Sequence, residues 1–174
     1  TYSITAGNTG GAFTINAATG AITVANSAAL DFETTPSFTL TVQASDGTLS
    51  DTAAITINLN NLNDNAPDIL DATVALDENS ANATAVTNVS DSFTGTDLDR
   101  DGQALTYSIT AGNTGGAFAI NAATGALTVA SSAALDFETT PSFTLTVQAS
   151  DGTLSDTAAI TVTRISSARF SSMT

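Results

Sequence analysis

The chain contains one sequence block twice. Residues 1–58 return at 106–163, a constant offset of 105, and the two copies differ at five positions. The differing pairs are Thr14/Ala119, Ile22/Leu127, Asn26/Ser131, Ile57/Val162 and Asn58/Thr163. A period of roughly 100 residues is the size of a whole domain, whereas solenoid repeats span about 20–50 residues. The sequence therefore predicts tandem domains of one fold.

Each copy has the hydrophobic pattern of a β-protein. Phe38, Leu40 and Val42 alternate with polar residues, which is typical of a strand with one face in a core. Residues 53–59 repeat this alternation, and turns rich in Gly, Asn and Asp separate the candidate strands. Tyr2 and Tyr107 are expected at buried strand positions. Short strands joined by regular turns favour an antiparallel sandwich.

The segment 66–105 precedes the second copy and has no counterpart before the first. It contains apolar patterns at 73–76 and 85–89, which predict two further strands, and an acidic loop at 96–102. The first domain is therefore expected to lack its first two strands, with an open sheet edge and an uncovered core. The predicted organisation is a partial domain at 1–65, a complete domain at 66–164 and a tail at 165–174.

The charge balance excludes several classes of function. The chain has 17 acidic residues against three basic ones, a formal net charge of −14, and no Cys or His. So much negative charge argues against a nucleic acid or an anionic membrane as partner. No apolar run approaches the roughly 18 residues of a membrane span. Without His, Cys or Lys most nucleophile–base pairs are missing, so we expect no enzyme.

Acidic and amide side chains gather at a few points of the sequence. Asn63, Asp64 and Asn65 follow one another between the two copies. Such short oxygen-bearing side chains suit Ca²⁺, which takes about six to eight oxygen ligands. Asp31/Glu33 and Asp97/Asp99 each place two carboxylates on one side of an extended segment, where they repel unless a cation lies between them. Any single pair is equally well read as solvated turn residues, but the whole set favours Ca²⁺.

These motifs resemble those of tandem cadherin repeats of the bacterial type. The resemblance covers nearly the whole chain, with five elements in the family's order. Phe stands in place of Arg in the third element. Two departures matter: Asn61 replaces the first Asp of the linker, and the first domain lacks its own equivalent of Glu78 together with its first strands. The elements are Glu78 after Leu76-Asp77, Asp97/Asp99, Asp31/Glu33 with its copy Asp136/Glu138, Ala44–Gly47 with its copy Ala149–Gly152, and the linker Asn61–Pro67.

The resemblance implies tandem seven-stranded Greek-key β-sandwiches of the cadherin and immunoglobulin-like kind. It also implies Ca²⁺ ions shared between the domain before the linker and the domain after it. Glu78, Asp136 and Glu138 would serve a following linker, whose motif Thr163-Arg164 replaces. The implied ligands of the linker present here are Asp31, Glu33, Asn63, Asp64, Asn65, Asp97, Asp99 and Asp151.

The expected function is a Ca²⁺-rigidified structural or adhesive repeat of an extracellular bacterial surface protein. Its partners would be neighbouring repeats or other copies of the chain, and strand exchange between copies would build a filament. The alternative is a carbohydrate-binding β-sandwich that contacts surface glycans. That alternative is less favoured, because glycan sites use exposed aromatic platforms and the chain has no Trp.

Overall fold

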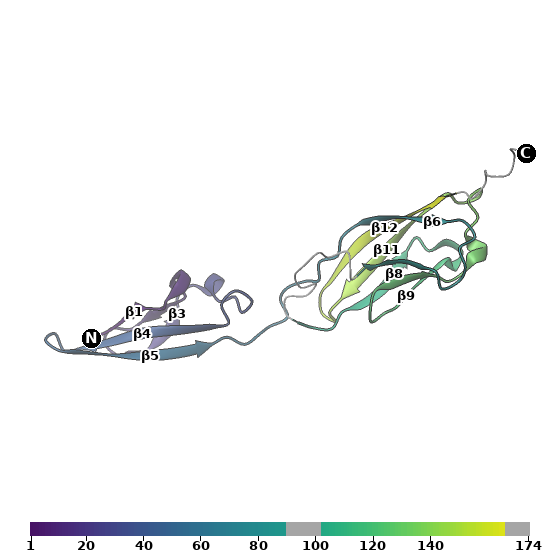
Figure 1. Ribbon diagram of the computed structural model, residues 1–174. Helices are drawn as coiled ribbons and strands as arrows, with labels where there is room; N and C mark the ends of the chain where they lie inside the picture. Colours follow the sequence, from purple (N-terminus) through teal and green to yellow (C-terminus); the bar gives the residue numbers. More distant parts are fainter. Residues whose placement is uncertain (90–101, 166–174) are drawn as a thin grey trace, which may run out of the picture. The chain divides into compact units, whose positions relative to one another are not determined.

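The computed structural model describes residues 1–89 and 102–165. It divides the chain into two compact units, residues 1–62 and Asn63 onward (Figure 1). Apart from short 3-10 turns, every regular element in the described part of the chain is a β-strand, so the protein is all-β, as predicted. The domain limits drawn from the repeat, at residues 65 and 164, remain a prediction.

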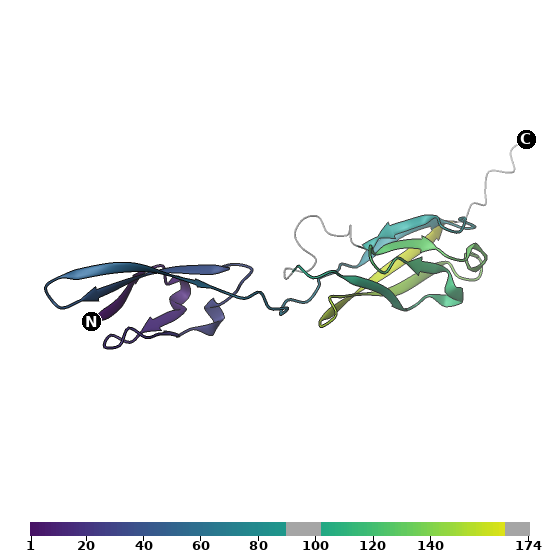
Figure 2. The same cartoon turned by 90° about the horizontal axis from the view of Figure 1, so that it is seen from below.

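The first unit consists of five strands. Strand β4 pairs antiparallel with β1 and with β5, and β2 forms a separate pair with β3. Figure 2 shows the β2–β3 pair on one side of the three-stranded sheet. The buried core is small, with Phe13 and Phe38 edge to face at a centroid distance of 5.1 Å. The strands are β1 (Tyr2–Ala6), β2 (Phe13–Ile15), β3 (Ile22–Val24), β4 (Ser37–Ser45) and β5 (Ser50–Asn58), with turns η1 (Thr9–Gly11) and η2 (Ser27–Ala29).

The described residues of the second unit, 63–89 and 102–165, form a sandwich of seven strands. One sheet has the order β6-β12-β11-β8 and the other the order β7-β10-β9. Strand β12 pairs antiparallel with β11 and parallel with β6, so the first and last strands of the unit run side by side in the same direction. The strands are β6 (Ala72–Asp77), β7 (Ala85–Asn88), β8 (Thr106–Ala111), β9 (Phe118–Ile120), β10 (Ala126–Val129), β11 (Ser142–Ser150) and β12 (Ser155–Ile165), with turns η4 (Thr114–Gly116) and η5 (Ser132–Ala134).

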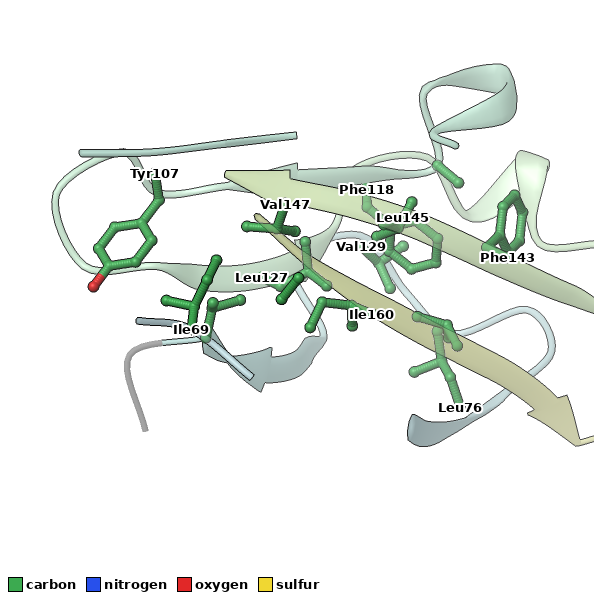
Figure 3. Close-up of a cluster of buried hydrophobic side chains, with 14 of the residues drawn as sticks. Ile69, Leu76, Tyr107, Phe118, Leu127, Val129, Phe143, Leu145, Val147 and Ile160 are labelled. Atoms are coloured by element: carbon green, nitrogen blue, oxygen red, sulfur yellow. The ribbon is translucent and has the colours of Figure 1, made fainter. Parts of the chain in front are cut away.

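The core of the second unit lies between its two sheets. Leu145, Val147 and Ile160 of one sheet point toward Leu127 and Val129 of the other (Figure 3). The segment that precedes the second copy completes this core, since its residues Ile69, Leu76 and Val89 belong to the same buried cluster. Alternation of apolar residues along β11 therefore does place one face of the strand inside, as the sequence predicts.

The same residues have different environments in the two units. Ile160 in β12 is 0% exposed, whereas its counterpart Ile55 in β5 is 38% exposed. Tyr107 is 5% exposed and its counterpart Tyr2 is 40% exposed, so the expected burial of Tyr2 was wrong. The segment before the second copy explains the difference, because its residues Ile69, Leu76 and Val89 belong to the buried cluster that contains Tyr107 and Ile160. The buried cluster of the first unit has no counterpart of these residues.

In both units a glycine approaches the backbone of a neighbouring strand closely. β8 meets β11 through an irregular register, and Gly112 follows directly after β8 with a φ of +81°. A Cβ atom built on Gly112 would lie 1.9 Å from the carbonyl oxygen of Thr144. Gly7 makes the same approach to Thr39 in the first unit. Only glycine satisfies both the left-handed φ and the contact with the neighbouring backbone.

Candidate metal centre

The predicted ligands of the first unit lie at the end from which the chain leaves it. Asp31 and Glu33 belong to the loop between η2 and β4. At this end Ser37 pairs with Asn58, and the N–H of Leu59 donates to the carbonyl oxygen of Pro36 at 2.9 Å. The two carboxylates are therefore positioned next to the start of the linker by the pairing of β4 with β5.

The local backbone favours the charged form of Asp31. The N–H of Thr34 donates to Asp31 Oδ1 at 3.1 Å, and this hydrogen bond lowers the pKa of Asp31 below its usual value. Asp31 is exposed, so the carboxylate carries its full charge at neutral pH. In contrast, Oε1 of Glu33 is removed from solvent. The loop thus offers one accessible carboxylate and one that is held against the protein.

In the second unit the predicted ligand Asp151 lies at the end where the chain enters. It occupies the turn between β11 and β12, and its Oδ1 accepts the N–H groups of Thr153 at 2.6 Å and Leu154 at 2.7 Å. These bonds fix the carboxylate, and its Oδ2 is out of contact with solvent. The entering chain is held at the same end, because the N–H of Ile69 donates to Asp156 Oδ2 at 2.9 Å.

The linker residues carry oxygens that suit a cation. Oδ1 of Asn63 is buried and accepts no hydrogen bond from the described residues. A buried carbonyl oxygen without a donor is costly, and a cation would satisfy it. Asn65 Nδ2 donates to Asp64 Oδ1 at 3.1 Å. The donors in this set are carboxylate and amide oxygens, the chemistry that Ca²⁺ prefers.

Not every predicted ligand can be placed. Asp97 and Asp99 lie outside the described residues. Among residues 1–89 and 102–165, no three His, Cys, Asp or Glu side chains come together in an arrangement that could hold a metal. The structure therefore locates Asp31, Glu33 and Asp151 at the unit ends that adjoin the linker. The predicted ligand set is described there without Asp97 and Asp99.

The acidic residues of the second copy lie at the opposite end of the second unit. Asp136 and Glu138 repeat Asp31 and Glu33, and Glu78 follows β6. Here the structure adds a residue that the sequence analysis mentioned only as an interruption of the motif. Arg164 is buried beside this group, with Nη2 donating to the carbonyl oxygen of Asp136 at 2.5 Å. Its strand position, in register with the alternating buried residues of β12, was the signal that could have revealed its burial.

Comparison with protein families identifies one domain type in both units. The family model described as "Cadherin domain" matches residues 1–60 and 72–163. Among curated proteins, the human protein "Protocadherin Fat 1" is 39% identical over 160 residues, covering 87% of this chain and 3% of its own length. The Drosophila melanogaster "Protocadherin-like wing polarity protein stan" is 40% identical over 169 residues, covering 90% of this chain and 4% of its own. The chain thus spans a small fraction of these relatives.

Solved structures share the fold. The extracellular cadherin domains 3–6 of protocadherin gamma B2 superpose with a TM-score of 0.77 at 23% identity, over 95% of this chain and 40% of that one. The human desmocollin-1 ectodomain superposes with a TM-score of 0.68 at 26% identity, over 94% of this chain and 33% of its own. In the part of the chain that the structure describes, no helix is long and apolar enough to cross a membrane.

Proposed function

We propose, from the premise that this chain belongs to the cadherin family, that it is a pair of Ca²⁺-stiffened adhesive repeats of a larger surface protein. Membership of the family places the chain outside the cell, and it supports an adhesive extracellular module rather than an enzyme.

The observation that carries the Ca²⁺ proposal is the position of the oxygen ligands within each unit. Asp31 and Glu33 lie at the end of the first unit where the chain leaves it, and Asp151 lies at the end of the second unit where the chain enters it. The buried Oδ1 of Asn63 belongs to the linker between the two copies in sequence. A shared set would also take Asp64, Asn65, Asp97 and Asp99. When bound, Ca²⁺ would supply the positive charge that these carboxylates lack. Without it, carboxylates brought together repel each other, and the linker is free to bend.

The proposal predicts that Ca²⁺ straightens and stabilises the chain. Millimolar Ca²⁺ should increase the maximum dimension measured by small-angle X-ray scattering and raise the melting temperature, with affinity on the order of 10⁻⁴–10⁻³ M. Asp151→Asn should weaken binding about tenfold, a change of ~1.4 kcal/mol. The double variant Asp97→Asn/Asp99→Asn should abolish both responses.

The repeat provides a matched control for this experiment. Asp46 occupies the same turn in the first unit, where its Oδ1 accepts the N–H groups of Thr48 and Leu49, each at 2.8 Å. These bonds lower the pKa of Asp46, with the bond from Leu49 contributing most. Because Asp46 lies at the far end of its unit, Asp46→Asn should leave the Ca²⁺ response intact. An equal loss in Asp46→Asn and Asp151→Asn, or no response of the wild type, would contradict the proposal.

The bacterial origin expected from the sequence is a further part of the proposal. Its support is the near-identity of the two copies, which differ at five of 58 positions and point to recent duplication within a long array. The flanking DNA should then encode more copies in one uninterrupted reading frame. Introns between the repeats would overturn this assignment.

Assembly with other copies is favoured by the uncovered face of the first unit. A hollow of about 280 Å³ lies on this face, lined by Tyr2, Ile22, Val42 and Ile55 among others. In the second unit residues 66–89 cover the equivalent face with apolar side chains. A hydrogen bond also holds this segment, because Asp71 Oδ1 accepts the N–H of Ala159 at 2.7 Å. The position of Ala159 is occupied by Ala54 of β5 in the first unit, so we infer that a strand of another copy would fit along β5.

Strand addition can be tested with a peptide. A synthetic peptide of residues 67–89 should bind the full chain at the first unit, because five differences in 58 leave the acceptor face almost unchanged. Binding is read from amide shifts of β5 in NMR spectra and from an increase in melting temperature. The peptide variant Leu76→Asp should not bind, since Leu76 is buried in the second unit. Equal binding of both peptides would argue against strand addition.

The carbohydrate-binding alternative has less support. It calls for an exposed aromatic ring, and the exposed Tyr2 lies within the face that strand addition would cover. Its counterpart Tyr107 is buried once that face is complete. We therefore place neighbouring repeats and other copies ahead of surface glycans as partners.

A further inference from the structure

The far end of the second unit contains a buried cation. Arg164 is 5% exposed and is the one charged residue in the buried part of the described chain. Its counterpart in the first copy, at the offset of 105, is Leu59. The backbone is the same at both positions, because the N–H of Arg164 donates to Pro141 at 3.1 Å and that of Leu59 donates to Pro36 at 2.9 Å. The two units therefore share this backbone hydrogen bond and differ in the side chain at the position.

The side chain of Arg164 is held by groups that compensate for its loss of water. Nη2 donates to the carbonyl oxygen of Asp136 at 2.5 Å, and Nη1 donates to that of Ala134 at 3.5 Å. The guanidinium carbon lies 5.0 Å from the centroid of the Phe143 ring, a cation–π distance. Carbonyl oxygens and an aromatic face together stabilise a guanidinium that has been removed from solvent.

The surroundings of Arg164 are acidic. Burial lowers the pKa of Arg164, and the negative charges of Asp136, Glu78 and Glu138 act in the opposite direction. A guanidinium stays protonated throughout the physiological pH range, so the cation is permanent. These three carboxylates are the residues that the sequence assigned to a second Ca²⁺ linker, and they form no metal-binding group within the described part of the chain.

We propose that the guanidinium of Arg164 takes the place of Ca²⁺ at this end of the second unit. The inference rests on the proposed function, in which the equivalent Asp31 and Glu33 bind Ca²⁺. A fixed positive charge beside Glu78, Asp136 and Glu138 reduces their repulsion and opposes the approach of a second cation. This end of the unit is consequently complete without Ca²⁺, whereas the linker end depends on it.

The test compares the two ends within one molecule. In ¹H–¹⁵N NMR spectra of the full wild-type chain, Ca²⁺ should shift the amides of Glu33, Asn63 and Asp151 and leave those of Asp136 and Glu138 unchanged. In Arg164→Leu, which restores the residue of the first copy, the amides of Asp136 and Glu138 should begin to shift at millimolar Ca²⁺. Arg164→Lys keeps the charge and should behave as the wild type. Mg²⁺ at the same ionic strength controls for screening.

A second neutral variant guards against loss of folding. Arg164→Gln keeps an amide donor for the carbonyl oxygens and should gain the same Ca²⁺ response as Arg164→Leu. The inference is overturned if the wild-type amides of Asp136 and Glu138 shift along with those of the linker, or if neither neutral variant gains a response. Failure of the proposed function has a different signature, because the amides of Glu33, Asn63 and Asp151 would then be silent in the wild type.

Discussion

Gly112→Ala is expected to destabilise the second unit by about 2–5 kcal/mol, a sum of two costs. A left-handed φ in a residue with a Cβ costs ~1–2 kcal/mol. The new methyl group would also lie 1.9 Å from the carbonyl oxygen of Thr144, which forces a backbone shift worth about 1–3 kcal/mol. Denaturant unfolding followed by the amide signals of β11 measures the change.

Gly116→Ala is the matched control for Gly112→Ala. Gly116 also has a positive φ, of +63°, but a Cβ there would meet nothing within 4 Å. Its substitution should therefore cost only the ~1–2 kcal/mol of the backbone conformation. If the two alanine variants are equally destabilised, the close approach of Gly112 to Thr144 is not what requires glycine.

Ile160→Asp should unfold the second unit, while the same change at Ile55 should be tolerated. Ile160 is fully buried between the sheets, so a carboxylate there loses its water without gaining a partner, at a cost of about 4 kcal/mol or more. Ile55 keeps 38% of its surface exposed, so the aspartate can remain hydrated at a cost of about 1 kcal/mol. Thermal melting of the two variants provides the comparison.

These paired variants also separate two explanations of the exposed face. If another copy covers Ile55 in solution, Ile55→Asp should abolish self-association at high concentration, which analytical ultracentrifugation detects. The stability of the isolated chain would hardly change. Similar large losses of stability at both positions would mean that the first unit is covered in the single chain, contrary to the structure.

Much of the fold follows from local patterns. The alternation of Phe38, Leu40 and Val42 predicts β4, and the apolar residues at 73–76 and 85–89 predict β6 and β7. Burial is a different matter. Ile55 and Ile160 have the same neighbours in sequence, but Ile160 belongs to a buried cluster that includes Ile69, Leu76 and Val89 of the preceding segment, and the cluster of the first unit has no such residues. The sequence of a strand does not encode which residues cover its apolar face. The alternation of apolar and polar residues therefore overestimates the burial of β5.

The candidate site is predictable in kind but not in detail. Short oxygen-bearing residues at the linker and at the strand ends indicate Ca²⁺, and the antiparallel pairing of β4 with β5 explains why Asp31 lies next to the start of the linker. The burial of Arg164 is a detail that composition does not predict. Arginine is rarely buried, so the residue type alone gives no reason to expect a core position. Its burial depends on carbonyl oxygens of Ala134 and Asp136 that only the folded chain brings together.

The parallel pairing of β6 and β12 has a mechanical consequence. The chain enters the second unit through β6 and leaves it through β12, and six residue pairs join the two strands, from Ala72–Ile160 to Asp77–Ile165. Tension on the two ends pulls these strands in opposite directions along their own axes. Their hydrogen bonds are then sheared together, whereas a hairpin pulled from its open end loses them one at a time. The unit therefore resists stretching at the contact that closes its sheet.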